Sequence, residues 1–101
     1  MNIIRKTTRF EKWFTKLRDI TAKGKILARL KRAELGNLGD FKLLGAGLFE
    51  MRIDYGPGYR VYFTRQGELI ILLLLGGDKS TQDRDITRAR QILTELGGYN
   101  G

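Results

Sequence analysis

Apolar and polar residues alternate along the stretch from residue 48 to residue 64. Because successive side chains of a strand point to opposite faces of a sheet, this spacing predicts two strands that each have one apolar face. Between them lies Tyr-Gly-Pro-Gly at residues 55–58, a composition typical of a tight turn. We therefore expect a β-hairpin around which the rest of the chain is organised. The side chains expected on its polar face are Glu50, Arg52, Arg60 and Tyr62.

Two amphipathic helices are predicted ahead of this hairpin. Thr8 followed by Glu11 is a capping-box pattern, which marks the start of the first helix. The second helix is expected to begin at a cap on Thr21 and to stop at Gly36. Each helix has apolar residues at helical spacing, which predicts one stripe that packs in the core. The first stripe is Phe10, Trp13, Phe14, Leu17 and Ile20, and the second is Ile26, Leu27, Leu30 and Ala33.

Three further strands complete the predicted sheet. Residues 2–7 and 41–44 form short strands, and residues 68–75 contain the unbroken apolar run LIILLLL. A run without alternation is typical of a strand that is covered on both faces. Residues 76–79, Gly-Gly-Asp-Lys, are then expected to form a loop.

A last helix and a short tail follow. Ser80 and Asp83 are the expected cap of this helix, and residues 97–101 are expected to be a frayed tail. The predicted inner face is Ile86, Ala89, Leu93 and Leu96, flanked by Ile92. The element order predicts a single α+β domain, in which an N-terminal strand and a helical hairpin pack on a mainly antiparallel, twisted sheet and a C-terminal helix closes the fold.

Positive charge is concentrated in the first third of the chain. The formal net charge is +8, and residues 1–34 hold eleven lysines and arginines against three acidic residues. This asymmetry favours contact with a polyanion, either a nucleic acid or an acidic protein, although a solvated helical surface is the simpler alternative. The residues expected to contact RNA or the ribosome are Lys12, Lys16, Arg18, Lys23, Lys25, Arg29, Lys31 and Arg32.

The composition excludes several kinds of site. The chain has no cysteine and no histidine, which excludes disulfides, thiolate nucleophiles, and the commonest metal ligand and general acid–base group. We expect no metal and no cofactor. The N-terminal residues lack the apolar segment of a signal peptide, and the longest apolar run, residues 69–75, is too short to span a membrane. These features predict a soluble cytoplasmic protein.

Two segments of the chain resemble the RelE/ParE toxin superfamily. They are FEMRIDYGPGYRVYF at residues 49–63 and LLLLGGDKSTQDRDI at residues 72–86. Together with the basic helical hairpin and the element order, they are most similar to the addiction-module killer proteins, a branch related to the HigB-type toxins. The resemblance extends over nearly the whole chain and implies a RelE-like fold.

This resemblance implies the toxin of a type II toxin–antitoxin pair. The ribonuclease members of the superfamily cut mRNA, generally on the translating ribosome, and a cognate antitoxin holds them inactive. In this branch the antitoxin is commonly a helix-turn-helix DNA-binding protein. The implied partners are therefore mRNA, the ribosome and such an antitoxin, with no membrane.

Only some of the site residues known in the family can be matched to residues of this chain. Arg60 matches the arginine of the family's Gly-Tyr-Arg segment, Arg52 matches a basic residue on the preceding strand, and Lys79 matches a basic residue after the last strand. Some members use a histidine or a C-terminal tyrosine as the general acid. This chain has no histidine, and Tyr99 lies in the expected tail, so the general acid stays unassigned.

The reaction implied by the resemblance is attack of a 2′-OH on the adjacent phosphate, which needs a base, cations around the phosphate and an acid for the leaving 5′-oxygen. Arginine suits the second role without a metal, since its planar guanidinium stays charged and can bind two phosphate oxygens at once. Glu50 or Lys79 could act as the base, and Tyr62 could donate a hydrogen bond or stack on an RNA base. The expected catalytic residues are Arg60, Arg52, Lys79, Glu50 and Tyr62.

Other interpretations stay open at this point. The RelE-like fold is shared with ParE-like inhibitors of DNA gyrase, so the fold alone does not decide the target. A non-catalytic, basic RNA-binding module is a third interpretation. Glu50, Arg52 and Arg60 could also form only a cross-strand ion-pair cluster, and Lys79 could be an ordinary solvated loop residue.

Overall fold

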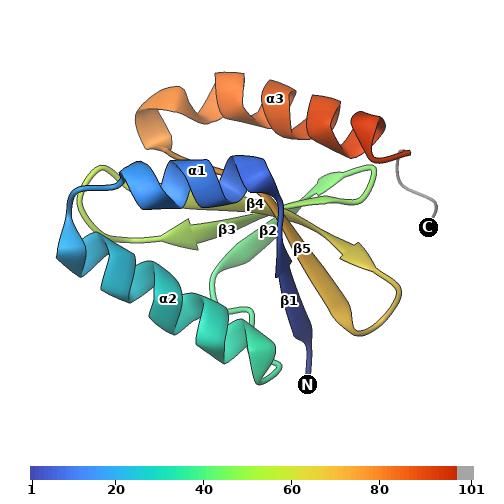
Figure 1. Cartoon of the computed structure of the whole chain (residues 1–101), viewed down its shortest axis with the longest axis horizontal. Coiled ribbons are helices and arrows are strands. Elements are labelled where there is room, and N and C mark those ends of the chain that lie inside the picture. The colour runs from blue at the N-terminus through green and yellow to red at the C-terminus, as the bar shows by residue number, and fades with distance from the viewer. Residues whose placement is uncertain (98–101) are drawn as a thin grey trace.

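Five strands and three helices, with one 3₁₀ turn, make up residues 1–97 of the computed structural model, which are the residues that the structure describes (Figure 1). The elements are β1 (Ile3–Lys6), α1 (Thr8–Lys16), α2 (Ile20–Glu34), β2 (Phe41–Gly45), β3 (Leu48–Ile53), β4 (Tyr59–Gln66), β5 (Ile70–Asp78), η1 (Lys79–Thr81) and α3 (Gln82–Glu95). The predicted element order and the α+β class are confirmed. Within residues 1–97 no helix is both long enough and apolar enough to cross a membrane. Tyr99 and most of the predicted tail lie outside the described residues.

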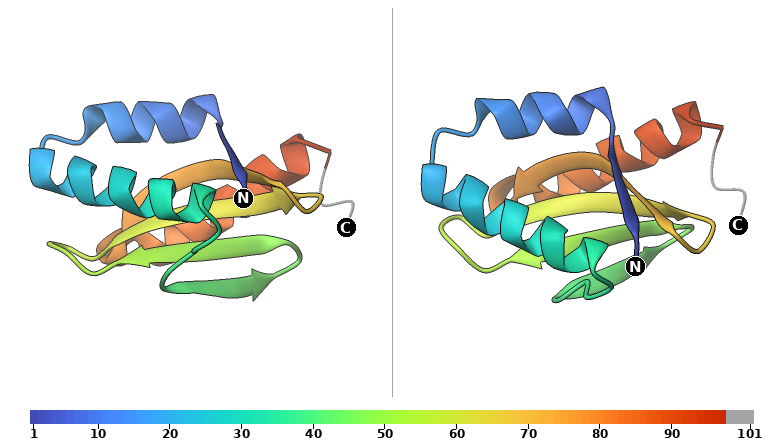
Figure 2. Two further views of the ribbon diagram at one scale, coloured as in Figure 1. Left: turned by 90° about the horizontal axis from the view of Figure 1, so that it is seen from below. Right: turned by 60° about the horizontal axis from the view of Figure 1, so that its bottom comes forward.

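One mixed sheet forms the centre of the molecule. Its strand order is β1-β5-β4-β3-β2, in which β1 pairs with β5 in parallel and the other neighbours are antiparallel. The predicted, mainly antiparallel sheet is therefore confirmed. Helices α1 and α2 cover one face of this sheet, and α3 lies across the other (Figure 2).

A hydrophobic core lies on each face of the sheet. The first core lies beneath α1 and α2 and includes Phe10, Ile26, Leu30, Met51, Val61, Phe63, Ile71 and Leu73. The second core lies beneath α3 and consists of Leu48, Tyr62, Leu74, Ala89, Ile92 and Leu93. Strand β5 contributes to both cores, which confirms that its apolar run is covered on both faces.

A bulge between β4 and β5 turns an extra apolar side chain toward α3. Tyr62 pairs with Leu75 and Phe63 pairs with Leu73, so Leu74 has no residue directly opposite it on β4. An unpaired residue of this kind breaks the strict alternation of a strand. Leu74 is consequently buried in the second core beside Tyr62.

Helix α1 is capped one residue earlier than predicted. The Thr7 hydroxyl accepts a hydrogen bond from the Phe10 N–H at 3.2 Å and donates one to the Leu74 carbonyl at 2.9 Å. The cap is thereby fixed to β5 as well as to its own helix. The predicted cap at Thr8 is wrong, because this contact with the sheet selects the neighbouring threonine.

The start of α2 also differs from the prediction. Asp19, rather than Thr21, is the cap, and its Oδ1 accepts from the Ala22 N–H at 3.1 Å. A side-chain oxygen at this position satisfies an N–H that has no partner within the helix. Ile20 therefore opens α2 and is 84% exposed, so its assignment to the apolar stripe of the first helix is wrong.

Two leucines expected on inner helical faces are exposed. They are Leu27 in α2 and Leu96, the residue that follows α3. Leu27 lies about 100° around the helix from Ile26, which takes the inward position instead. Ile92, which was expected only to flank the inner face of α3, is buried. The buried stripe of α2 is Ala22, Ile26, Leu30 and Ala33.

Gly76 and Gly77 lie within β5, which extends to Asp78, so the predicted loop at residues 76–79 is wrong. A Cβ added at Gly76 would overlap the Trp13 ring, and one added at Gly77 would overlap the Asp85 carboxylate. The two glycines therefore allow α1 and α3 to approach the opposite faces of one strand.

The segment before α3 is capped by the end of β5. Asp78 Oδ1 accepts from the Ser80 N–H at 2.8 Å and from the Ser80 hydroxyl, which orders the 3₁₀ turn. Thr81 is the N-cap of α3 and makes no side-chain capping bond. The predicted cap of Ser80 with Asp83 is wrong, because Ser80 is held by Asp78 one turn earlier.

The close contact at Gly76 leads to a stability test. Gly76→Ala should lower the free energy of unfolding by about 1–3 kcal/mol, since the added methyl group overlaps the Trp13 ring. Gly24→Ala is the matched control: Gly24 lies in α2 with open space around it, and alanine there should stabilise the protein by up to about 1 kcal/mol. Urea unfolding of both variants measures the difference. Equal stability of Gly76→Ala and wild type would contradict the described packing.

Candidate active site

A surface cleft of about 360 Å³ lies at the turn end of the β3–β4 hairpin. Residues that are far apart in the sequence line this cleft. They are Asp40, Arg52, Asp54, Gly56, Pro57, Gly58, Arg60 and Lys79. The structure therefore brings together three of the residues predicted for catalysis, Arg52, Arg60 and Lys79.

Strand register places the cationic side chains of the cleft. Arg52 of β3 is directly opposite Arg60 of β4, and Arg60 is directly opposite Gly77 of β5. Directly opposite residues project to the same face of a sheet. A Cβ added at Gly58, which has a φ of +80°, would lie 3.4 Å from the Lys79 Cβ and 3.5 Å from Arg60 Nη1. The side chains of Lys79 and Arg60 therefore both lie next to Gly58, the glycine that ends the turn.

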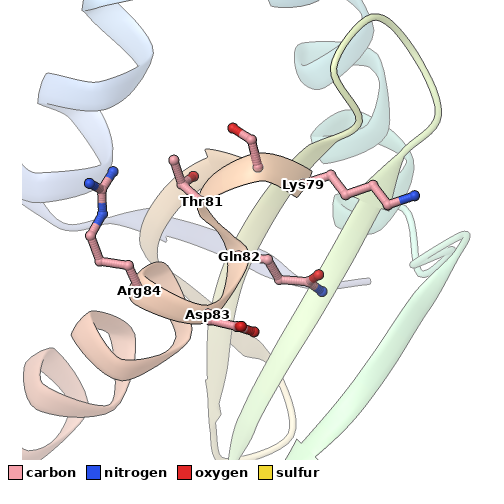
Figure 3. Close-up of a pocket in the computed structure, with 6 residues that line it drawn as sticks. Lys79, Thr81, Gln82, Asp83 and Arg84 are labelled. Atoms are coloured by element: carbon pink, nitrogen blue, oxygen red, sulfur yellow. The ribbon is translucent and has the colours of Figure 1, made fainter.

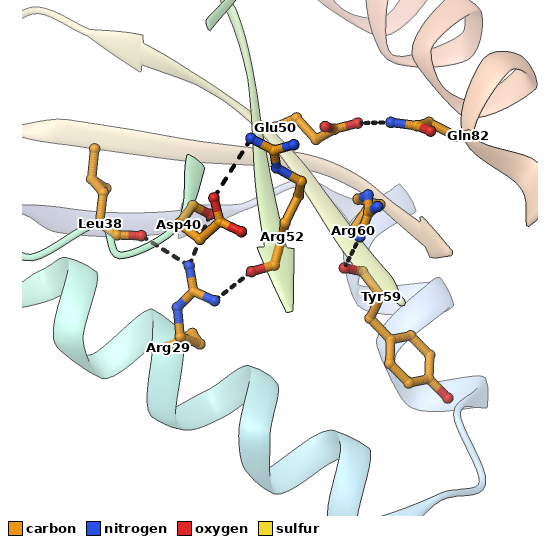
Figure 4. A network of polar contacts seen from close by, with 8 residues as sticks. All are labelled: Arg29, Leu38, Asp40, Glu50, Arg52, Tyr59, Arg60 and Gln82. Atoms are coloured by element: carbon orange, nitrogen blue, oxygen red, sulfur yellow. Dashed lines mark hydrogen bonds and ion pairs between the residues drawn. The ribbon is translucent and has the colours of Figure 1, made fainter. Parts of the chain in front are cut away.

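Arg60 makes no ion pair with any carboxylate of residues 1–97. Its Nη1 donates to the carbonyls of Gly58 and Tyr59, both at 3.3 Å, and its buried Nε has no hydrogen-bond partner in this part of the chain. Arg52 instead lies 3.5 Å from the Asp40 carboxylate, and its side chain is 37% exposed (Figure 4). The cleft therefore presents one unpaired guanidinium beside one that is loosely paired, an arrangement that suits a phosphate group.

Glu50 shares a face with both arginines, as predicted, but that part of the face is not open to solvent. The side chain is 1% exposed, and its Oε2 accepts a hydrogen bond from Gln82 Nε2 of α3 at 2.7 Å (Figure 4). Helix α3 covers this part of the polar face. Within the described residues Glu50 makes no ion pair with Arg52 or Arg60, so the cross-strand ion-pair cluster is wrong. A catalytic role for Glu50 stays a prediction.

Tyr62 is fully buried beneath α3 and has no exposed surface on which an RNA base could stack. Burial raises the pKa of its phenol well above the usual range, and the nearby carboxylates of Glu50 and Asp85 raise it further, against a smaller opposing effect of Arg60. The hydroxyl therefore keeps its proton at neutral pH. The catalytic role of Tyr62 stays a prediction. Because the side chain is buried, it could act only through the residues around it and not by touching the substrate.

Arg29 was expected on the RNA-binding surface, but its guanidinium points into the fold. It donates to the carbonyls of Leu38 at 3.1 Å, Asp40 at 3.0 Å and Arg52 (Figure 4). Burial lowers its pKa, with a further contribution from Arg32. Arg29 therefore ties α2 to the strand that carries Arg52, and its assignment to an exposed surface is wrong.

The other seven basic residues expected to contact RNA lie on α1, α2 and the connection between them. Lys23 is partly buried, and its Nζ lies 5.5 Å from the centre of the Phe14 ring. Lys31 forms an ion pair with Glu34 at 3.0 Å. Contact of this surface with RNA stays a prediction. Its exposed members are Lys12, Lys16, Arg18, Lys25, Lys31 and Arg32.

A second cavity of about 360 Å³ shares Lys79 with the cleft (Figure 3). Its lining is the continuous segment from Lys79 to Arg84. Gln82 belongs to this segment, so the amide that holds Glu50 also forms part of the cavity wall. Lys79 is exposed between the two hollows.

Three residues at the site were not among those predicted for catalysis. Asp54 continues the polar alternation of Glu50 and Arg52, so its position on the same side was visible in the sequence. No pattern in the sequence placed Asp40 or Gln82 at the site. Both reach the site through contacts between segments that are distant in the sequence.

Comparison with known proteins gives two matches. Residues 12–94 match the model of the family described as Phage derived protein Gp49-like (DUF891). A protein of Haemophilus influenzae, described as an uncharacterized protein, is 51% identical over 94 residues, which cover 93% of this chain and 95% of that relative. The family match includes every residue that lines the cleft.

The partly buried guanidinium of Arg29 leads to a second stability test. Arg29→Lys should lower the free energy of unfolding by about 1.5–3 kcal/mol, because an ammonium group cannot serve three separate carbonyls in the same geometry. Arg32→Lys is the matched control on an exposed position of the same helix, and it should change stability by no more than about 0.5 kcal/mol. Urea unfolding of both variants and of wild type measures these changes in unfolding free energy. Equal effects of the two substitutions would contradict the role given to Arg29.

The raised pKa of Tyr62 leads to a test at alkaline pH. The protonated phenol favours the folded state, so its contribution is complete below the unfolded-state pKa of about 10 and is lost as the pH rises toward the folded-state value. Above pH 10, wild type should lose up to about 1.4 kcal/mol of unfolding free energy per pH unit more than Tyr62→Phe. Urea unfolding at a series of pH values measures both slopes. Parallel slopes would contradict the burial of the phenol.

Proposed function

Because the chain belongs to the Gp49-like family, a toxin-like family of the RelE/Gp49 type, we propose that it is the toxin of a type II toxin–antitoxin pair and a HigB-like, ribosome-dependent mRNA endonuclease. Membership of this family implies an antitoxin partner in general. The proposed antitoxin is a helix-turn-helix protein. The other proposed partners are the ribosome and its mRNA, so the site of action is the cytoplasm.

The observation that carries this proposal is the convergence of Arg52, Arg60 and Lys79 on one cleft. Attack of a 2′-OH on a phosphodiester builds negative charge on the phosphate oxygens, and cations held in place before the reaction stabilise that charge. Two carboxylates, Asp40 and Asp54, also line the cleft, so the cations remain in excess. This charge balance favours a phosphate ligand and requires no metal.

Arg60 is the proposed principal ligand of the scissile phosphate. Its guanidinium is partly buried, and within the described residues it donates hydrogen bonds only to carbonyl oxygens and pairs with no carboxylate. A charge in this state gains most from an incoming anion. Arg52 adds a second contact, since its half-exposed pair with Asp40 at 3.5 Å is weak enough to exchange for a phosphate.

We assign the base to Asp54 and the acid to Lys79. Asp54 lines the cleft, is exposed and makes no ion pair within residues 1–97, whereas Glu50 is buried against Gln82. Asp54 accepts the 2′-OH proton as the 2′-oxygen bonds to phosphorus. The bond from phosphorus to the 5′-oxygen then breaks, and the Lys79 ammonium, which has donors and no acceptor, protonates the leaving oxygen. Glu50 supports β3 beneath α3.

The exposed basic residues of α1 and α2 are the proposed contact with ribosomal RNA. They lie on the face of the sheet opposite to α3. Binding through phosphate contacts of this kind weakens steeply as salt concentration rises. The same charges would suit an acidic antitoxin segment.

Arg60→Ala in a translating extract tests the proposal. Wild type should create new mRNA 5′ ends detectable by primer extension, and the variant should lower their rate of appearance by about 10²–10³-fold, the usual cost of removing a transition-state donor. Arg88→Ala is the matched control, because Arg88 is exposed on α3 and lines neither cavity. A gyrase supercoiling assay runs in parallel. Intact mRNA together with blocked supercoiling would replace this proposal with a ParE-like gyrase inhibitor.

A further inference from the structure

The turn between β3 and β4 forms one wall of the cleft. Asp54 and residues 56–58 line it directly. Within the turn the Gly58 N–H donates to the Tyr55 carbonyl at 3.0 Å. This bond closes the turn on itself but does not fix its position relative to the helices, so any contact that holds the turn from outside also sets the shape of the cleft.

Tyr55 provides such a contact. Its ring packs at the edge of the first core, and its hydroxyl donates to Asp19 Oδ2 at 3.1 Å. The other carboxylate oxygen of Asp19 accepts from the Ala22 N–H and caps α2. Lys25 of the same helix lies over the Tyr55 ring, with its Nζ 5.3 Å from the ring centre. The start of α2 is therefore bonded to the wall of the cleft.

Arg60 depends on the same turn from the other side. Its Nη1 hydrogen bonds go to the backbone carbonyls of Gly58 and Tyr59. Both distances are 3.3 Å, at the long end for this type of bond, and its Nε has no partner in the described chain. Within the described residues, the carbonyls at the end of the turn and the start of β4 are therefore the hydrogen-bond partners of the guanidinium.

We propose that Asp19 and Tyr55 are positioning residues that hold the turn, and through it the Arg60 guanidinium, in the geometry that binds the scissile phosphate. This inference rests on the proposed nuclease function for its kinetic effect, but not for its structural one. Electrostatic stabilisation requires donors held in place before the reaction, and small displacements of a reacting group reduce rates strongly. The cap of α2 thereby acts on a side chain of β4 that it does not touch.

Two substitutions remove the contact while keeping the surrounding structure. Tyr55→Phe keeps the ring and its packing on Lys25 and removes only the hydroxyl. Asp19→Ser keeps a favoured capping oxygen for α2 and removes the oxygen that Tyr55 uses. Each should lower the single-turnover rate of mRNA cleavage at saturating toxin about tenfold. For Tyr55→Phe the toxin concentration that gives half the maximal rate should not change, since this variant alters no charge on the proposed ribosome-binding helices.

The double variant Asp19→Ser/Tyr55→Phe should cleave no more slowly than either single variant, because both remove the same contact. Thr94→Val is the matched control: it removes an exposed hydroxyl from α3, at a residue that lines neither cavity, and should cleave at the wild-type rate. Full additivity of the two single effects, or a wild-type rate for Tyr55→Phe, would overturn the proposal while leaving the nuclease function intact.

A second readout does not depend on cleavage. The Arg60 Nε–H is shielded from water, so its signal in ¹⁵N-labelled protein, identified by its loss in Arg60→Ala, reports the order of the guanidinium. Tyr55→Phe should shift or broaden this signal, and the control Thr94→Val should not. If wild type fails to cleave mRNA, the nuclease function is contradicted and this signal alone decides: an unchanged signal in Tyr55→Phe overturns the positioning role.

Discussion

The antiparallel pairing of β3 with β4 is the constraint on which the site depends. This register puts Arg52 directly opposite Arg60, and the neighbouring pair of β4 with β5 brings Lys79 beside them. A slip of one residue in either strand would send the arginine of that strand to the opposite face, into the first core. The two cores prevent that slip, because each face of the hairpin is already matched to the helices that cover it.

Helix α3 covers one part of the polar face of the hairpin and leaves the other part open. Glu50 and Tyr62 lie beneath this helix and are buried, whereas Arg52 and Arg60 lie beyond its N-terminal end and line the cleft. Two like charges directly opposite each other destabilise a sheet, and the pairing of Arg52 with Asp40 offsets this only in part. The excess positive charge that remains does not stabilise the sheet, and it supports the proposed binding of a phosphate at this cleft.

The sequence predicted what depends on local periodicity and left open what depends on tertiary contact. Alternation along residues 48–64 was sufficient to place Glu50, Arg52, Arg60 and Tyr62 on one face, because the strand period is set by the backbone itself. No local signal showed that α3 covers half of that face. Gly76 and Gly77 resemble a loop unless the Trp13 ring and the Asp85 carboxylate that fill their space are known.

The decisive measurement is a structure of the protein on a translating ribosome whose mRNA carries a 2′-deoxy nucleotide at the mapped cleavage site, which blocks the reaction. We expect the scissile phosphate to lie within hydrogen-bond distance, about 3 Å, of the Arg60 guanidinium, with Arg52 and Lys79 close by and the turn at residues 55–58 in place. An mRNA phosphate bound elsewhere on the protein, or a bound protein whose cleft faces away from the mRNA, would contradict it.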